Sequence, residues 1–237
     1  MQRKIITTAD GSKTIQIEDW NEQYHSVHGA IQEANHVYIK QGLLFFYNEH
    51  ILGVSETICH SEPNSESHPI SILEIGFGTG LNAILTLLVS EELKLNINYC
   101  GVEAYPVSTE ELSQLNYAEA LKIQSSAFVD IHKSDWETSH KVTKQFRLTK
   151  QQKFFNDIVD VNCYDVIYFD AFGARVQPEL WTEVIFKKMY DALKPNGVLV
   201  TYSAKGSVKR ALRAVGFSIK RLEGPPGKRH MLRAIKS

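Results

Sequence analysis

The fold of this chain is decided by one stretch, Ile72-Leu73-Glu74-Ile75-Gly76-Phe77-Gly78-Thr79-Gly80-Leu81-Asn82. The apolar run up to Ile75 predicts a buried strand, the three glycines predict a tight turn, and the residues from Leu81 predict the start of a helix. A second apolar run further along ends in Glu103. A strand, a glycine loop, a helix and a second strand that ends in a carboxylate form half of a nucleoside-binding α/β fold.

Predicted strands and helices alternate along the chain from this stretch onward, which favours a mostly parallel, doubly wound sheet. The last two predicted strands are joined by the short run Glu223-Gly224-Pro225-Pro226-Gly227, which cannot hold a helical crossover, so they should be antiparallel neighbours. We therefore expect an α/β protein with a Rossmann-like seven-stranded, mostly parallel sheet and a reversed C-terminal strand, the pattern of class I methyltransferases. The predicted strands are 70–75, 98–103, 128–132, 164–170, 197–203, 217–222 and 230–236, and the predicted helices are 80–92, 107–122, 178–194 and 205–215.

The N-terminal part of the chain has a different pattern. Residues 4–17 alternate around Asp10-Gly11, which predicts a hairpin. Helical spacing runs from residue 29 to about residue 58, and the polar run 61–69 indicates a linker. The sequence therefore predicts a small N-terminal extension of a hairpin and a helix over 1–66, followed by a Rossmann-like methyltransferase domain over 67–237.

Composition limits the other possibilities. The chain has 237 residues, which is long enough for one sizeable core. Its formal net charge is −1, and so small a net charge does not indicate a partner. No apolar run approaches the roughly 20 residues that span a bilayer, and the N-terminus lacks the apolar core of a signal peptide, so we expect a cytoplasmic protein without membrane attachment. The three cysteines and nine histidines show no paired ligand spacing, so we expect no metal.

The glycine spacing predicts the cofactor. Nicotinamide enzymes usually show Gly-x-Gly-x-x-Gly, whereas the compact Gly76-x-Gly78-x-Gly80 is typical of enzymes that bind S-adenosylmethionine, in which no diphosphate needs a wide cradle. Glu103 would accept hydrogen bonds from both ribose hydroxyls, although a solvated carboxylate is the simpler alternative. The third predicted strand is followed by Asp135, which could bind the adenine amino group, and by Trp136, which could flank the ring or belong to the core. The expected cofactor-binding residues are Glu74, Gly76, Phe77, Gly78, Thr79, Gly80, Asn82, Glu103, Asp135, Trp136 and Asp170.

Several segments carry a resemblance to one protein family. They are 76–82, Asp170-Ala171-Phe172 followed by Pro178-Glu179-Leu180-Trp181, 201–210 and 227–232, and more weakly 24–34. Together they resemble the MnmC-like methyltransferase domain, which acts in the biosynthesis of 5-methylaminomethyl-2-thiouridine in tRNA. The family often continues with Ala-Pro after Asp-Ala-Phe, whereas this chain has Gly173-Ala174-Arg175-Val176. By the resemblance this loop lines the acceptor side, so the departure leaves the identity of the acceptor open.

The resemblance implies an S-adenosylmethionine-dependent N-methyltransferase. Its acceptor would be the primary amine of 5-aminomethyl-2-thiouridine, a modified wobble uridine of tRNA, and its product 5-methylaminomethyl-2-thiouridine. Larger bifunctional members of the family carry a flavin-dependent oxidase domain that makes the amine. This chain would be a stand-alone form without that domain, and a separate flavin-dependent oxidase is then a candidate partner.

Asp170 is the expected catalytic residue, because a carboxylate at a strand end can orient the amine and take its proton. Its alternative roles are a cofactor contact or a helix cap. The expected substrate-binding residues are Phe172, Tyr202, Lys205, Lys228 and Arg229, with Lys228-Arg229 as a phosphate clamp within a basic C-terminal segment. Two other functions stay open at this point: a methyltransferase or aminopropyltransferase that acts on a small amine, and a non-catalytic RNA-binding protein.

Overall fold

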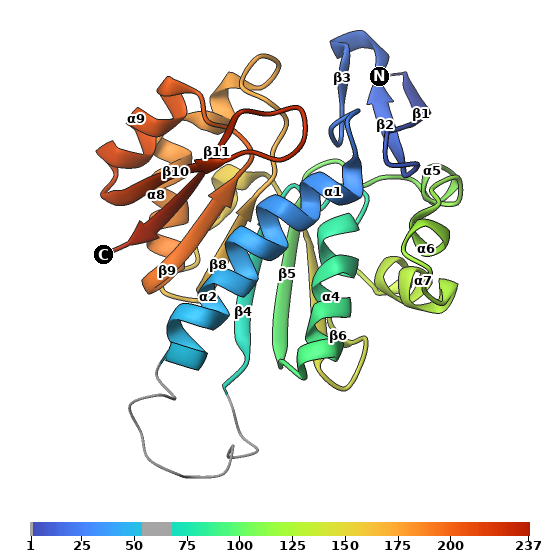
Figure 1. The fold of residues 1–237 in the computed structure, drawn as a ribbon, viewed down its shortest axis with the longest axis horizontal. Coiled ribbons are helices and arrows are strands. Elements are labelled where there is room, and N and C mark those ends of the chain that lie inside the picture. Colours follow the sequence, from blue (N-terminus) through green and yellow to red (C-terminus); the bar gives the residue numbers. More distant parts are fainter. Residues whose placement is uncertain (1, 54–67) are drawn as a thin grey trace.

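The computed structural model describes residues 2–53 and 68–237, which form one large and one small β-sheet (Figure 1). The strands of the large sheet are β4 (Ile70–Ile75), β5 (Ile97–Glu103), β6 (Ser139–Lys141), β7 (Phe146–Gln152), β8 (Tyr164–Phe169), β9 (Leu193–Thr201), β10 (Phe217–Glu223) and β11 (His230–Lys236). Their order is β10-β11-β9-β8-β4-β5-β7-β6. The central strands pair in parallel, and β11 runs antiparallel to both β9 and β10. The predicted fold class and the reversed strand are confirmed, and the short β6 is one strand more than expected.

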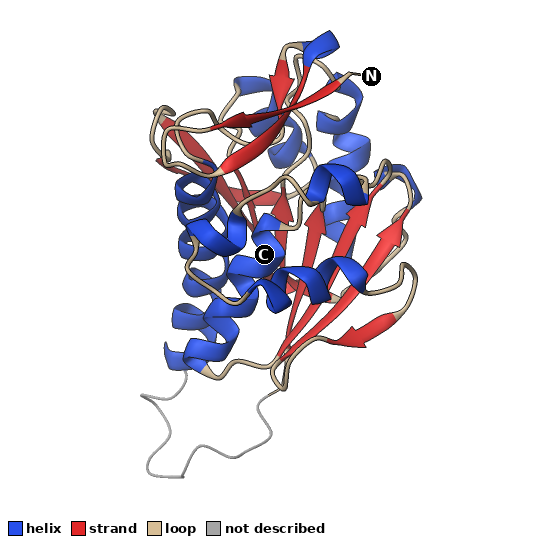
Figure 2. Cartoon of the chain, turned by 90° about the vertical axis from the view of Figure 1, so that its right-hand side faces the viewer, coloured by secondary structure: helices blue, strands red, loops and turns tan. Residues whose placement is uncertain are grey.

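Helices cover both faces of the large sheet (Figure 2). One face packs against α4 and the N-terminal helix in a core that includes Ile84, Val37 and Ile72, and the other packs against α8 and α9 in a core that includes Phe186 and Leu212. The helices of this part of the chain are α4 (Leu81–Leu93), α5 (Thr109–Leu112), α6 (Tyr117–Ala120), α7 (Ser125–Lys133), η4 (Phe155–Asp157), η5 (Pro178–Trp181), α8 (Glu183–Ala192) and α9 (Gly206–Ala214). Within the described ranges, no helix is both long enough and apolar enough to cross a membrane.

The N-terminal segment begins with the predicted hairpin, which is confirmed. The hairpin consists of β1 (Arg3–Thr7) and β2 (Lys13–Ile17), and η1 (Glu18–Trp20) and β3 (Glu22–Gln23) follow. A continuous helix then runs through α1 (Ala30–Ala34), η2 (Asn35–Leu44), α2 (Phe45–Tyr47) and η3 (Asn48–Leu52), and η2 and η3 are π-helical. The end of the predicted helix, most of the predicted linker and the predicted boundary at 66/67 lie outside the described residues.

The hairpin turn holds the start of α1. Asp10 Oδ2 accepts a hydrogen bond from the backbone N–H of Gln32 at 3.1 Å, and Thr8 Oγ1 accepts one from Ala30 at 3.4 Å. Gly29, at the junction, has a φ of +144°, and a Cβ atom there would lie 2.8 Å from Asp10 Oδ2. Only glycine can therefore bring the hairpin this close to the helix, and the small sheet is fixed over one end of the large sheet.

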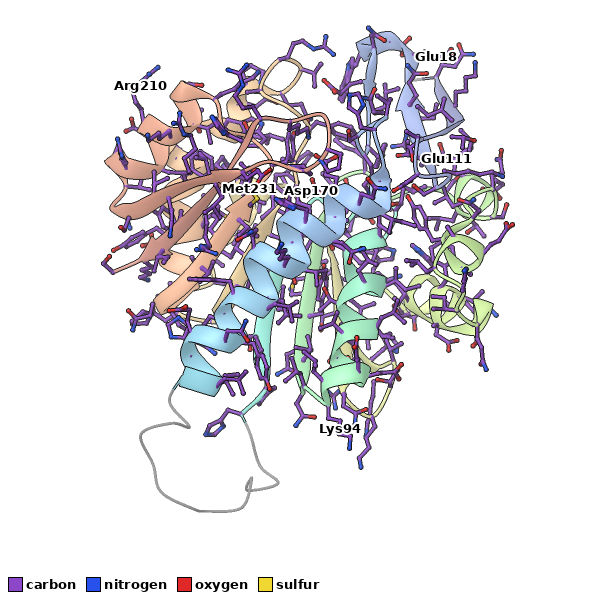
Figure 3. The ribbon with its side chains drawn as sticks, in the orientation of Figure 1. Glu18, Lys94, Glu111, Asp170, Arg210 and Met231 are labelled. Carbon is purple, nitrogen blue, oxygen red and sulfur yellow. The ribbon has the colours of Figure 1, made fainter. Side chains whose placement is uncertain are left out.

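The register of the parallel strands sets the position of the site. Ile75 of β4 pairs with Val102 of β5 and with Phe169 of β8. The next residues, Gly76, Glu103 and Asp170, therefore leave the sheet side by side at its carboxyl edge, where open α/β sheets bind ligands. Figure 3 shows Asp170 near the end of the sheet that faces the small N-terminal sheet, with Lys94 at the opposite end.

Three predicted elements were wrong in type or extent. Residues 128–132 are not a strand but part of α7, since Phe128, Ile131 and His132 follow helical spacing that a short apolar run does not reveal. The third parallel strand is β7, which the sequence concealed because its buried side chains include Lys150.

The predicted helix 107–122 is interrupted where the Asn116 side chain bonds the N-terminal hairpin. Asn116 accepts a hydrogen bond from Lys13 N at 2.8 Å and donates one to Gly11 O at 3.0 Å. The predicted helix 178–194 divides into η5 and α8, and its last residues begin β9.

Candidate functional site

A cavity of about 270 Å³ lies at the carboxyl edge of the large sheet. Its floor is made by the glycine loop and the ends of β5 and β8, and it is covered by residues 22–28, which we call the roof. The roof follows the N-terminal hairpin, so residues far apart in sequence enclose one space. The residues that line the cavity are Glu22, Gln23, Tyr24, His25, Ser26, Val27, His28, Glu33, Ala34, Tyr38, Glu74, Gly76, Phe77, Gly78, Thr79, Leu81, Asn82, Glu103, Asp170, Ala171, Phe172, Gly173, Tyr202, Gly227 and Lys228.

The glycine loop requires glycine at its first position. Gly76 has a φ of +90°, and a Cβ atom there would lie 2.7 Å from the backbone oxygen of Asp170, which cannot move away. Gly78 also has a positive φ, and a Cβ atom there would lie 3.1 Å from the Tyr24 ring of the roof. The loop thus brings bare backbone against both the strand end of Asp170 and the roof.

A chain of hydrogen bonds joins two carboxyl groups of the site, those of Glu74 and Asp170. Asn82 Nδ2 donates to Glu74 Oε1 at 2.8 Å and to Asp170 Oδ2 at 2.9 Å. The Tyr99 hydroxyl donates to Glu74 Oε2 at 2.8 Å, and the Tyr38 hydroxyl donates to Asp170 Oδ1 at 2.5 Å. Asp170 is therefore held on both oxygens by residues of α4 and of the N-terminal helix.

Burial raises the pKa of both carboxyl groups in this hydrogen-bond chain. Desolvation raises the pKa of Asp170 to about 7, although the hydrogen bonds from Tyr38 and Asn82 lower it. Desolvation also raises the pKa of Glu74 well above its ordinary value, and the charge of Asp170 adds to this. Groups that change charge near neutral pH in a cleft are suited to proton transfer, and the pKa of Asp170 lies in that range.

Glu103 ends β5 beside the glycine loop. Its Oε2 accepts a hydrogen bond from Gly78 N at 3.1 Å, and its Oε1 accepts one from Tyr105 N at 3.0 Å. Desolvation raises the pKa of Glu103, and these backbone donors act in the opposite direction. These two backbone donors hold the Glu103 carboxylate in one orientation at the rim of the cavity.

A second cavity, of about 1,090 Å³, adjoins the first and shares Tyr24, Glu103, Ala171 and Phe172 with it. Its wall beyond Glu103 comes from the segment that follows β7, namely Phe154, Phe155, Asn156 and Asp157. The sequence analysis expected Asp135 and Trp136 to follow the third parallel strand. That strand is β7, and the segment that follows it is 154–157.

Asp135 and Trp136 lie apart from both cavities. Neither lines either space, because the strand that was expected to end before them is helix α7. Trp136 packs beneath the glycine loop, with its ring centroid 6.2 Å from that of Phe77, and Lys150 Nζ lies 5.1 Å from the Trp136 ring centroid. The adenine contact predicted for Asp135 is therefore wrong in its structural premise.

The other residues predicted for the cofactor take two kinds of position. Phe77, Thr79 and Asn82 line the first cavity, whereas Gly80 is beneath it, where a Cβ atom would lie 3.0 Å from the His132 ring. His132 Nε2 is 3.1 Å from Thr79 O, and burial lowers the pKa of His132 to about 4. The underside of the loop thus rests on a neutral histidine.

Of the residues predicted to bind substrate, three lie in the first cavity. Phe172 packs against Tyr24 of the roof, with ring centroids 4.9 Å apart, and the Tyr202 hydroxyl donates to Ala171 O at 2.8 Å. Lys228 lines the cavity, and its Nζ lies over the Tyr202 ring. Lys205 and Arg229 do not line either cavity and are exposed, so the structure separates Lys228 from the Arg229 with which it was paired as a clamp.

Sequence reasoning missed several residues of the site. Tyr24, Glu33 and Tyr38 belong to the N-terminal segment, which showed a weak family resemblance and received no site residue. That resemblance was the signal that could have found Tyr24 and Glu33. Asp157 was missed because β7 was not recognised as a strand.

The lining of the first cavity fits S-adenosylmethionine. This cofactor carries a sulfonium, an ammonium and two ribose hydroxyls, all of which seek negative charge or hydrogen-bond acceptors. The cavity offers five carboxyl groups and a single lysine, and Asn82 Oδ1 is a buried acceptor for which the described chain supplies no partner. The donor-poor, acidic lining therefore suits a cationic nucleoside better than a dinucleotide phosphate.

Comparisons with known proteins agree with this geometry. A family model described as S-adenosyl-L-methionine-dependent methyltransferase matches residues 124–237. The "tRNA 5-methylaminomethyl-2-thiouridine biosynthesis bifunctional protein MnmC" of Burkholderia thailandensis is 26% identical over 225 residues, and that of Hydrogenovibrio crunogenus is also 26% identical over 225 residues. Each alignment covers 90% of this chain, which spans about a third of the length of these relatives (32% and 31%).

Two solved structures extend the comparison. The crystal structure of MNMC2 from Aquifex aeolicus matches with a TM-score of 0.74 and 25% identity over 100% of this chain and 70% of its own. Spermidine synthase from Thermotoga maritima matches with a TM-score of 0.50 and 16% identity over 99% of this chain and 73% of its own, and it shares the fold alone.

The fold, the acidic cavity and these matches define an S-adenosylmethionine-dependent methyltransferase, with S-adenosylmethionine as its cofactor. Within that class, the chain resembles the methyltransferase domain of the MnmC proteins along nearly its whole length, as the sequence motifs predicted.

Proposed function

We propose that this protein transfers a methyl group from S-adenosylmethionine to the primary amine of 5-aminomethyl-2-thiouridine at the wobble position of tRNA. The observation that carries the proposal is the buried carboxyl group of Asp170, which lies between the glycine loop and Tyr202 in one acidic cavity. The similarity to the MnmC proteins supports tRNA as the acceptor.

The cofactor would lie across both cavities. The glycine loop and Asn82 would hold its methionine part, and Glu103 would accept hydrogen bonds from the ribose hydroxyls. We assign the adenine contact to Asp157, on the segment that follows the third parallel strand, in place of Asp135. The cofactor-binding set is then Glu74, Gly76, Phe77, Gly78, Thr79, Asn82, Glu103, Asp157 and Asp170, with Gly80 and Trp136 supporting the loop from below.

When bound, S-adenosylmethionine supplies a methyl group on a positively charged sulfur, which a neutral amine can attack. The protein must therefore present the amine without its extra proton. Asp170, ionised above pH 7 or so, would accept a hydrogen bond from the amine and take a proton from it as the new bond forms. Tyr38 and Asn82 would keep the Asp170 carboxylate in one orientation, so that the amine approaches the methyl group in line.

The acceptor side combines aromatic faces with nearby positive charge. Phe172 and Tyr202 would flank a base turned out of the anticodon loop, since unpaired bases are the usual targets of specific RNA recognition. Lys205 and Arg229, both exposed, would contact RNA phosphates, so binding should weaken with salt. A flavin-dependent oxidase would make the amine, and the methyl transfer would take place in the cytoplasm.

The test is methyl transfer in vitro. The protein is incubated with radiolabelled S-adenosylmethionine and tRNA from cells that lack it, and the nucleosides are then separated and identified by mass spectrometry. We expect the label in 5-methylaminomethyl-2-thiouridine. Label in another nucleoside would overturn the acceptor, and transfer to putrescine or another small amine but not to tRNA would favour the small-amine alternative. Binding of tRNA without any transfer would favour a non-catalytic role.

A further inference from the structure

The side chain of Lys228 lies inside the first cavity. Lys228 follows the Pro225-Pro226-Gly227 turn between β10 and β11, a loop that lies beside α1 (Figure 1). Its Nζ forms an ion pair with Glu33 Oε1 and lies 3.9 Å from the centre of the Tyr202 ring. Lys228 is the one lysine among the residues that line this cavity.

These contacts are those that bind a primary alkylammonium group. A carboxylate neutralises the charge, and the aromatic face of Tyr202 attracts the cation. The Tyr202 ring is fixed by the hydrogen bond from its hydroxyl to Ala171 O at 2.8 Å, one residue after Asp170. The positive charge of Lys228 also lowers the pKa of Asp170, which places the two groups within electrostatic reach.

We propose that Glu33 and the Tyr202 ring form the subsite for the primary amine of the acceptor, and that the ammonium of Lys228 occupies it in the free protein. The inference rests on the proposed function, since it names the amine-binding groups of that site. Two ammonium groups cannot share one carboxylate and one ring face, so the protonated acceptor must first displace Lys228. Its amine must then release the extra proton to solvent before it attacks the methyl group beside Asp170.

The subsite stays formed when Lys228 leaves. Glu33 is buried on α1, and its Oε2 accepts a hydrogen bond from Ser26 N at 2.8 Å, a contact that does not involve Lys228. The loop that carries Lys228 rests on the N-terminal segment through His36 Nε2, 2.9 Å from Glu223 O, and a Cβ atom at Gly227 would lie 2.1 Å from His28. The lysine can therefore swing away while the carboxylate and the ring remain in place.

The test measures binding of the nucleoside 5-aminomethyluridine by calorimetry, with S-adenosylhomocysteine bound to the protein. In Lys228→Met the competing ammonium is absent. If Lys228 fills the subsite in about nine-tenths of the molecules, its loss should tighten binding of the amine about tenfold. Uridine, which lacks the amine, should bind wild type and variant alike. Glu33→Gln should weaken binding of the amine, and Lys40→Met, which removes the same charge from an exposed position of the N-terminal helix, should leave it unchanged.

Amine binding that is equal or weaker in Lys228→Met overturns the inference, since Lys228 would then assist the acceptor or be neutral to it. S-adenosylhomocysteine binding shows that the variant is folded, and Lys228→Gln provides the same comparison if the methionine variant fails this check. The two proposals fail separately. Wild-type protein that binds no S-adenosylhomocysteine or labels no tRNA contradicts the proposed function, whereas normal tRNA methylation without tighter amine binding in the variants contradicts the subsite alone.

Discussion

The hydroxyl of Tyr38 donates a hydrogen bond of 2.5 Å to Oδ1 of Asp170, across 132 residues of sequence. Tyr38 belongs to the N-terminal helix, and Asp170 ends β8 of the large sheet. The helix that begins beneath the roof thus reaches the carboxyl group to which we assign the proton transfer. The orientation and the pKa of that group depend on the docking of the N-terminal segment.

Replacing Tyr38 by Phe should move the pH dependence of methyl transfer. The hydrogen bond from Tyr38 favours the ionised form of Asp170, so its loss should raise the pKa of Asp170 from about 7 by about one unit. In a profile of kcat against pH with saturating tRNA and cofactor, the acid limb should shift to higher pH by that amount. Tyr47→Phe, further along the same helix, is the control. An unshifted acid limb would show that Tyr38 does not act on Asp170.

Replacing Asp170 by Asn should remove the proton acceptor while the shape of the site is kept. Single-turnover methyl transfer should slow by about 10²- to 10⁴-fold, as expected for the loss of a general base. Calorimetry should show that S-adenosylhomocysteine still binds. Near-normal single-turnover rates at saturating cofactor would remove Asp170 from the chemistry.

The same variant should be more stable than the wild type at pH 8. Asp170 has a pKa of about 7 in the folded protein against an ordinary 3.8, so the folded state holds this proton more tightly than the unfolded state. Its contribution to stability therefore falls as pH rises from about 4 to 7, and the full penalty is present above that range. We expect Asp170→Asn to raise the free energy of unfolding at pH 8 by about 2 kcal/mol, roughly half of what the whole shift would give. Urea denaturation at pH 8 and at pH 4, where the difference should vanish, measures this.

Glu103 should contribute to cofactor affinity rather than to turnover. Its carboxylate is held by Gly78 N and Tyr105 N at the rim of the cavity, where we propose that it binds the ribose hydroxyls. Glu103→Ala should weaken S-adenosylhomocysteine binding by about 10- to 100-fold, the loss expected for hydrogen bonds to a charged acceptor. Glu92→Gln, an exposed acid on α4, is the matched control. Affinity within twofold of the wild type in Glu103→Ala would refute the assignment.

Asp157 and Asp135 give opposite expectations. Asp157 lines the second cavity beside Phe154, and Asp135 lines neither cavity. Asp157→Asn should weaken S-adenosylhomocysteine binding by about tenfold, and Asp135→Asn should leave it unchanged. The reverse order of the two affinities would restore the adenine site that the sequence predicted.

Gly76→Ala should damage both stability and cofactor binding. Its φ of +90° is unfavourable for alanine, and the added Cβ atom would lie 2.7 Å from a backbone oxygen of Asp170 that cannot yield. The strain should lower the free energy of unfolding by about 1–3 kcal/mol. Gly206→Ala is the control, because the nearest atom there is the end of the flexible Arg210 side chain, 3.3 Å away. Thermal unfolding of both variants tests the difference, and a Gly76→Ala protein as stable as the wild type would contradict it.

The predictable part of the structure was the part with strong local signals. The strand and glycine loop from Ile72 to Asn82 predicted β4, the turn and α4, and the spacing to Glu103 predicted the next strand end, as the register confirms. Asp10-Gly11 predicted the hairpin, and the short loop before β11 predicted the reversed strand. In each case neighbouring residues determine the conformation.

The less predictable part depends on distant contacts. β7 buries Lys150, whose Nζ donates to His132 O at 2.9 Å, so a charged residue conceals the alternation of the strand. Tyr38 appeared only as a position in a predicted helix, and Glu33 appeared there and in the weak resemblance over 24–34. The tertiary docking of that helix on the sheet is what brings both residues into the site. A sequence pattern cannot reveal such a contact, because the partner lies more than a hundred residues away.

The position of β11 has a consequence for the order in which the protein folds. β11 pairs with both β9 and β10, so β10 precedes it in the chain but can join the sheet only through it. During synthesis, β10 emerges with no edge to receive it and must wait, exposed, for a strand made later. The two strands should therefore gain protection from hydrogen exchange together, in a single late step of refolding.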